Sequence, residues 1–166
     1  MQADHPTPTM ARFQSEFVAY AAIHQNGMNR FLHLLGIPVI VVGLQALLFS
    51  LGGLYAVAAF SALASMPIFQ RSFHAGFTLL GFFALLAPVA VLCVSGAPIF
   101  SGLMYSALLF VLGWAIQFLG HFFEKRHPEL LDSPINILIG PLFITYEVMP
   151  FLKPFRLDRD NTTRGA

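Results

Sequence analysis

The chain has 166 residues, of which 57% are hydrophobic and only 10% are charged, and its mean hydropathy is +0.72. Soluble domains carry about 25% charged residues, so this composition excludes an ordinary soluble domain and indicates a single-domain integral membrane protein. The formal net charge of +1, without a basic stripe interleaved with aromatic residues, predicts no nucleic-acid partner. The single cysteine, Cys93, excludes a disulfide framework and a cysteine-based zinc motif.

Four apolar runs approach the roughly 20 residues that a helix needs to cross about 30 Å of hydrocarbon. In chain order they cover residues 31–51, 54–69, 77–95 and 99–120. The segments between them contain Gly52-Gly53, Gln70 to His74 and Ser95 to Pro98, which have the composition of turns. The sequence therefore predicts an all-α integral membrane bundle with four transmembrane helices.

A fifth apolar stretch, 134–152, contains Gly140-Pro141 and Pro150 and precedes a tail with one lysine and three arginines. A simple crossing would place these cations outside, against the positive-inside rule, so we expect a re-entrant or interfacial helical hairpin. The whole chain is expected to be one membrane domain. Its parts are a polar N-terminal segment at 1–19, a helical membrane core at 20–152 and a polar cytoplasmic tail at 153–166.

The distribution of charge predicts which ends of the spans lie together. If all four runs cross, the turns at 52–53 and 95–98 share one side and carry no charge. The opposite side receives the cations Arg12, Arg30, Arg71, Lys125 and Arg126, which is the pattern of a cytoplasmic face. An even number of crossings also returns the chain, between His33 and His121, to the face that it left. The short, bare loops favour a bacterial inner membrane over an organelle membrane.

Two polar clusters flank these runs. Asn29 and His33 are four residues apart and share a helical face, while Gly27 is expected to interrupt the helix and let His24 fold back towards them. In the fourth run a single helical stripe with 3, 4, 3 spacing contains Trp114, Gln117, His121 and Glu124. Imidazole and carboxylate groups on facing helices are the donors with which bundles bind iron or zinc. Spacing alone supports a metal site and a buried polar network equally.

Several polar residues have ordinary alternatives. Glu124 is a candidate ligand, but a surface carboxylate paired with Arg126 or Arg30 has equal support. Glu147 lies in an apolar stretch, where it is either a functional group or a polar anchor at the membrane interface. The remaining histidines are expected to form interfacial hydrogen bonds or to cap a helix end; these are His5, His74 and His127.

Two motifs resemble the signatures of the 2-hydroxy fatty acid dioxygenase family. The first reads YAAIHQNGMNRFLHLLGIP over residues 20–38, and the second reads WAIQFLGHFFEKRHPELL over residues 114–131. The later Gly140-Pro141 and Glu147 fit the C-terminal part of that family. Phe122 and Glu129 depart from the pattern, since the family commonly has a small residue after the Gly-His pair and an alanine at the position of Glu129.

The resemblance implies an Fe(II)-dependent dioxygenase that carries out α-oxidation of 2-hydroxy fatty acids with O2 in a lipid bilayer. It points to His24, His33 and His121 as metal ligands, with Glu124 as a further candidate. Fe(II) bound by such groups keeps open positions, where a 2-hydroxy acid could chelate beside O2. Arg30 is then expected to pair with the substrate carboxylate, and Asn29 and Gln117 to orient the ligands.

Three rival classes share parts of this pattern. A two-metal membrane hydroxylase or desaturase would need about eight histidines in paired motifs, and the chain has six. A zinc-dependent membrane hydrolase would use the same ligands but would need no O2. A non-catalytic membrane protein would use the motifs as a buried polar network. The pattern predicts no particular oligomeric state.

Overall fold

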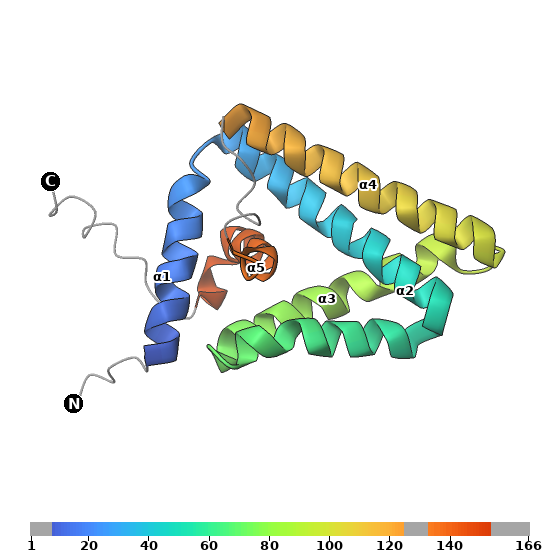
Figure 1. The fold of residues 1–166 in the computed structure, drawn as a ribbon, viewed down its shortest axis with the longest axis horizontal. Coiled ribbons are helices and arrows are strands. Elements are labelled where there is room, and N and C mark those ends of the chain that lie inside the picture. The colour runs from blue at the N-terminus through green and yellow to red at the C-terminus, as the bar shows by residue number, and fades with distance from the viewer. Residues whose placement is uncertain (1–7, 125–132, 154–166) are drawn as a thin grey trace, which may run out of the picture.

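The computed structural model describes residues 8–124 and 133–153, and every regular element in these ranges is a helix (Figure 1). The elements are α1 (Pro8–Ile23), α2 (Gly27–Phe69), α3 (Phe73–Val94), α4 (Ile99–Glu124), α5 (Asn136–Val148) and the 3-10 helix η2 (Pro150–Leu152). The all-α prediction is therefore confirmed. Lys125, Arg126, His127 and the cations after Lys153 lie outside the described residues.

Helix α2 is too long for one crossing and turns back on itself. Its 43 residues would extend about 65 Å at 1.5 Å per residue, roughly twice the thickness of the hydrocarbon core. The backbone leaves the helical region at Gly52 (φ −144°, ψ 17°) and Gly53 (φ 62°, ψ −157°), and Figure 1 shows the chain reversing direction there. The predicted turn between the first two apolar runs is thus present.

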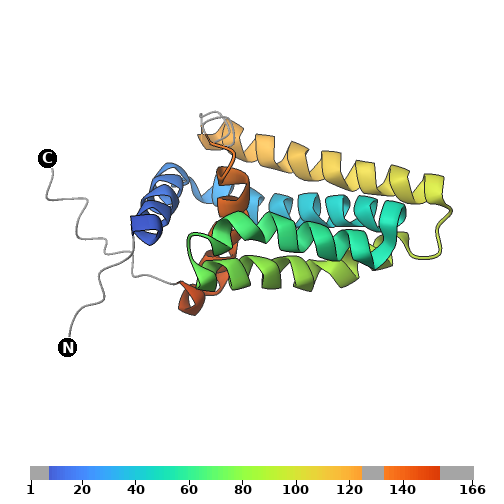
Figure 2. The ribbon, with the colours of Figure 1, turned by 60° about the horizontal axis from the view of Figure 1, so that its bottom comes forward.

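The helices after this turn bring the two polar clusters to one end of the molecule. Figures 1 and 2 show the start of α2 and the end of α4 beside α1, with the α2 bend and the α3–α4 connection at the opposite end. Among the described residues, three helices are long and apolar enough to cross a membrane, namely α2, α3 and α4. The count of exactly four crossings stays a prediction.

Glycines allow α2 and α4 to approach closely. A Cβ on Gly43 would lie 2.5 Å from the backbone nitrogen of Phe110, and a Cβ on Gly113 would lie 2.6 Å from the backbone nitrogen of Ile40. Small residues at such crossings let helix backbones pack against each other inside a membrane. This contact fixes the register in which the first turn of α2 meets the last turn of α4.

Helix α1 belongs to the packed core, although we expected residues 1–19 to form a polar segment. Phe13, Phe17 and Tyr20 are buried at helical spacing, and they pack on α5 with ring centroids 5.6 Å apart for Phe17 and Tyr146 and 5.4 Å apart for Tyr20 and Phe143. These aromatic residues bury enough apolar surface to hold the helix in place. The polar residues between them lie on the other face of the helix.

Helix α5 fills the space bounded by α1, α2 and α3, where Figure 1 shows it nearly end-on. It runs through Gly140 and Pro141 without a break, so the expected interruption there does not occur. Residues 139–144 and Tyr146 are buried. At 13 residues the helix extends about 20 Å, which is shorter than the hydrocarbon core. Its placement in the membrane stays a prediction.

Charged side chains gather at the end of the molecule that carries α1. Glu16 accepts from Arg12 at 3.1 Å and lies 3.5 Å from Arg71 at the α2–α3 connection. Arg30 in the first turn of α2 forms an ion pair with Glu147 of α5. Three of the predicted cytoplasmic cations therefore lie at one end of the fold, opposite the uncharged turns.

Candidate metal centre

His24 occupies the short connection between α1 and α2. Its backbone nitrogen bonds to the Tyr20 carbonyl at 3.3 Å, and its Nδ1 lies 2.8 Å from the same oxygen. Because a carbonyl only accepts, Nδ1 carries the proton and Nε2 carries the lone pair. The His24 ring also stacks on the Tyr20 ring with centroids 4.1 Å apart. His24 is therefore held in one tautomer and one orientation.

His33, in the second turn of α2, is held in the same way. Its Nδ1 lies 2.9 Å from the carbonyl oxygen of Asn29, four residues earlier. This bond again places the proton on Nδ1 and leaves Nε2 as a lone-pair donor. His24 and His33 are each only 1% exposed, so neither imidazole relies on bulk water for its partners.

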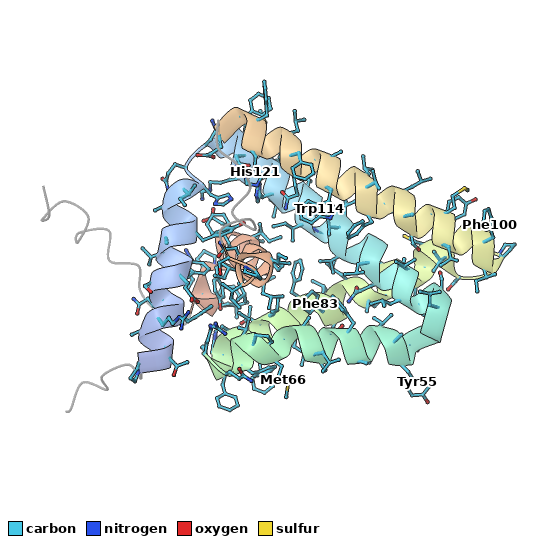
Figure 3. The ribbon with its side chains drawn as sticks, in the orientation of Figure 1. Tyr55, Met66, Phe83, Phe100, Trp114 and His121 are labelled. Atoms are coloured by element: carbon cyan, nitrogen blue, oxygen red, sulfur yellow. The ribbon has the colours of Figure 1, made fainter. Side chains whose placement is uncertain are left out.

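His121 completes a cluster of three histidines. The ring centroids lie 4.8 Å apart for His24 and His33, 4.9 Å for His33 and His121, and 5.8 Å for His24 and His121. One ligand atom from each residue lies within 4.8 Å of the others. Figure 3 shows His121 at the end of α4 that faces α1. The predicted approach of His24 and His33 to His121 is confirmed.

The chemistry of this cluster fits a metal ion. Nε2 of His24 is buried and has no hydrogen-bond partner among the described residues. Burial lowers the pKa of His24 below its ordinary value of 6.5, against smaller upward effects of the Tyr20 carbonyl and the Glu124 carboxylate. The imidazole is therefore neutral at neutral pH and can donate its lone pair. Converging neutral imidazoles are ligands that iron, zinc and copper accept.

Glu124, at the end of α4, holds the connection between α1 and α2. Its carboxylate accepts hydrogen bonds from the backbone nitrogen of Gln25 at 3.3 Å, from that of Asn26 at 3.2 Å and from the Asn29 side-chain amide at 2.9 Å. Asn26 in turn caps α2 by accepting from the backbone nitrogen of Met28 at 2.9 Å. Glu124 is not a member of the cluster whose ligand atoms converge.

Asn29 connects Glu124 to the histidines. Its side-chain amide donates to Glu124, and its carbonyl accepts from His33. The side chain is fully buried beside Gly120, where an added Cβ would lie 2.5 Å from Asn29 Oδ1. Asn29 thus contacts both a histidine and the carboxylate that holds the connection, and its orienting role stays a prediction.

A cavity of about 210 Å³ opens beside the cluster. Its lining includes His33 of α2 and, from α4, Trp114, Gln117 and His121. Figure 3 shows Trp114 and His121 along α4. The predicted stripe of Trp114, Gln117 and His121 therefore faces one space. Gln117 is only 7% exposed, and its Oε1 has no partner within the described part of the chain.

The other predicted site residues lie apart from this cavity. Arg30 pairs with Glu147 and, with it, lines a second cavity of about 120 Å³ between α2 and α5. Both interpretations of Glu147, a functional group and a polar anchor, stay predictions. His74 is exposed at the start of α3. His5 and His127 lie outside the described residues.

The partners that orient the histidines and the walls of the cavity were not among the residues predicted from the sequence. The carbonyls of Tyr20 and Asn29 each precede a histidine by four residues, and this i, i+4 spacing was a usable signal. No local spacing in the sequence indicated that α5 and the second part of α2 form walls of the cavity. They depend on tertiary packing between segments that are far apart in the sequence.

The fold and this site together define a helical protein of membrane type with a three-histidine cluster, buried at His24 and His33 and half-buried at His121, that is suited to a metal ion. The profile of the Mpo1-like family, described as 2-hydroxy-palmitic acid dioxygenase Mpo1-like, matches residues 10–151, and the chain belongs to this family. It is also 44% identical over 43 residues to the 2-hydroxy-palmitic acid dioxygenase MPO1 of Saccharomyces cerevisiae. That match covers 25% of each protein. No solved structure matches the chain significantly.

Proposed function

We propose that this protein is an Fe(II)-dependent dioxygenase that shortens 2-hydroxy fatty acids by one carbon. The observation that supports this most directly is the convergence of two buried histidines and the half-buried His121 beside a largely apolar cavity. Membership of the Mpo1-like family and the similarity to a 2-hydroxy-palmitic acid dioxygenase support the substrate class. A cluster of this kind suits an amphipathic substrate whose reacting carbons lie next to its polar head.

The proposed reaction is balanced with O2 as the only oxidant. The bond between C1 and C2 breaks, C1 leaves as CO2, and C2 becomes the carboxyl carbon of the shortened acid. O2 accepts the four electrons, and water is the remaining product. The histidine cluster is the one place where described residues offer converging metal ligands.

We assign metal binding to His24, His33 and His121, which leave further coordination positions for substrate and O2. Iron, when bound there, supplies the activation of O2. Asn29 and Glu124 are assigned to positioning. Glu124 accepts hydrogen bonds from the Asn29 side chain and from the backbone nitrogen of Asn26, two residues after His24. Such outer partners keep a ligand in its productive tautomer and orientation.

The proposed site lies at the cytoplasmic face of a bacterial inner membrane. Arg12, Arg30 and Arg71 lie at the end of the molecule that holds the histidines, and positive charge is enriched in cytoplasmic segments. The opposite end carries the uncharged connections at 52–53 and 95–98. Cysteine accessibility at these two ends in intact cells tests the orientation.

The test of the function uses purified full-length protein in lipid nanodiscs, loaded with Fe(II) and given 2-hydroxypalmitic acid and O2. We expect mass spectrometry to find the acid that is one carbon shorter. His24→Ala, His33→Ala and His121→Ala should each lose the product and most of the bound iron. His74→Ala is the matched control, because His74 is an exposed histidine outside the cluster.

Two results would contradict the proposal. One is product formation at an undiminished rate without O2, which would favour a zinc-dependent hydrolase or another oxygen-independent reaction. The other is full retention of iron in all three alanine variants, which would leave the histidines as a buried polar network.

A further inference from the structure

We propose that the cavity beside the histidines binds the carboxyl-proximal part of the acyl chain and that Gln117 accepts a hydrogen bond from its 2-hydroxyl group. The identity of this ligand rests on the proposed function. The location of the binding site is inferred from the volume and the lining of the cavity.

The lining of the cavity combines a few polar side chains with a largely apolar wall. The polar ones are His33 and His121 of the ligand cluster, together with Gln117, Tyr20 and Asn136. The apolar wall includes Ile37, Ile40, Leu44, Phe60 and Phe83. A ligand that satisfies both kinds of lining needs a compact polar head followed by a hydrocarbon chain, as in a 2-hydroxy fatty acid. Figure 3 shows Trp114 and Phe83 on facing helices around this space.

The volume limits how much of the chain fits. At about 210 Å³ the cavity lies below the roughly 300–1,000 Å³ of pockets that enclose a drug-sized ligand, so it accommodates the polar head and only the first part of a long acyl chain. The rest of a long chain must leave the cavity between the helices, where lipid would receive it. The polar head and the first carbons are therefore the part that the protein recognises.

Gln117 is the residue that recognises the 2-hydroxyl group. Its side chain is only 7% exposed, and its Oε1 lacks a hydrogen-bond partner among the described residues. A buried acceptor without a partner is costly, and a ligand hydroxyl that donates to it removes that cost. The same oxygen receives nothing from a fatty acid without the 2-hydroxyl. Gln117 thus favours hydroxylated chains.

Trp114 provides the binding assay, because it is the single tryptophan of the chain and lines the cavity. We expect 2-hydroxypalmitic acid brominated in the first half of its chain to quench Trp114 fluorescence in the metal-free protein. Unlabelled 2-hydroxypalmitic acid should restore the signal by competition. Quenching that this competitor does not relieve would come from the surrounding lipid and would overturn the assignment.

Ala64→Phe and Leu44→Phe add bulk to two different walls of the cavity. The added ring takes up space that the acyl chain needs, so each variant should weaken probe binding by about tenfold or more. Leu63→Phe is the matched control, since Leu63 precedes Ala64 and is 68% exposed. Unchanged probe affinity in two folded cavity variants would refute the site.

Gln117→Met keeps the length of the side chain and removes the acceptor. We expect it to reduce the preference for the 2-hydroxylated probe over the same probe without the hydroxyl by about tenfold, the effect of one hydrogen bond. An unchanged preference would remove Gln117 from the site. Quenching of Trp114 fluorescence measures probe binding independently of turnover. Selective binding without a shortened product would therefore contradict only the proposed function, whereas product formation with unaffected cavity variants would contradict only this inference.

Discussion

The carboxylate of Glu124 accepts a hydrogen bond from the side-chain amide of Asn29 at 2.9 Å, and this contact joins the end of α4 to the first turn of α2. The same carboxylate also holds the backbone that follows His24. Three segments that each contribute one histidine therefore meet at a single carboxylate. Two predictions concern the residues at this junction.

Glu124→Ala should weaken iron binding without abolishing it. Loss of a group that orients a metal ligand commonly costs about 10- to 100-fold in affinity, whereas loss of a ligand itself should remove most binding. Competition with a chelator under anaerobic conditions measures the difference from His121→Ala. Glu16→Ala is the control, because Glu16 forms its ion pairs with Arg12 and Arg71. An affinity equal to that of the wild type in Glu124→Ala would show that the junction does not support the histidines.

Gly120→Ala should disrupt the site although it adds only one methyl group. The new Cβ would lie 2.5 Å from Asn29 Oδ1 and 3.3 Å from His33 Nδ1, so α4 or the Asn29 side chain must move. We expect a loss of iron affinity of about tenfold or more and a lower melting temperature, in keeping with overpacking of a buried contact. Gly81→Ala, inside α3 with nothing within 4 Å of the added atom, should leave iron affinity unchanged and leave the melting temperature equal or slightly higher, because alanine favours a helix more than glycine does. Equal behaviour of both variants would contradict the close approach at Gly120.

The Arg30–Glu147 ion pair tests whether Arg30 contacts the substrate. The pair is partly exposed, with side-chain exposures of 41% and 30%, and such pairs contribute about 0.2–1 kcal/mol. Arg30→Ala and Glu147→Ala should therefore have similar small effects on thermal unfolding. We expect both to leave the KM for a 2-hydroxy acid within about twofold of the wild type. A large rise in KM for Arg30→Ala alone would instead support the predicted pairing with the substrate carboxylate.

Local signals in the sequence predicted much of the site. Residues spaced by three or four along a helix share a face, so the sequence alone groups Asn29 with His33, and Trp114 with Gln117 and His121. The convergence of these groups from different helices followed from counting crossings and placing arginines. Both arguments concern single helices or whole spans, whose periodicity and charge are visible in the sequence.

The contacts around the site that involve α1 and α5 could not be predicted from helical periodicity or charge. The roles of Tyr20 and Phe143 depend on α1 packing against α5, because their ring contact joins residues more than a hundred positions apart. The pairing of Arg30 with Glu147 likewise depends on where α5 docks. Sequence patterns do not record such distant contacts. The helix break was predicted at Gly27, but it lies at residues 24–26, where the Asn26 side chain caps α2.

The last prediction concerns Gly53, because its conformation lets the second part of α2 return towards the histidines. Its φ of 62° and ψ of −157° lie near a backbone region that only glycine adopts readily, where another residue costs about 1–3 kcal/mol. Gly53→Ala should lower the free energy of unfolding by that amount, although nothing lies within 4 Å of the added methyl group. Gly27→Ala, also in open space but at the start of a helix, should be neutral or slightly stabilising. Chemical denaturation in detergent compares the two. Equal stability of both variants would mean that α2 tolerates another geometry at the bend, and the return of the chain to the face of His33 would then need a different cause.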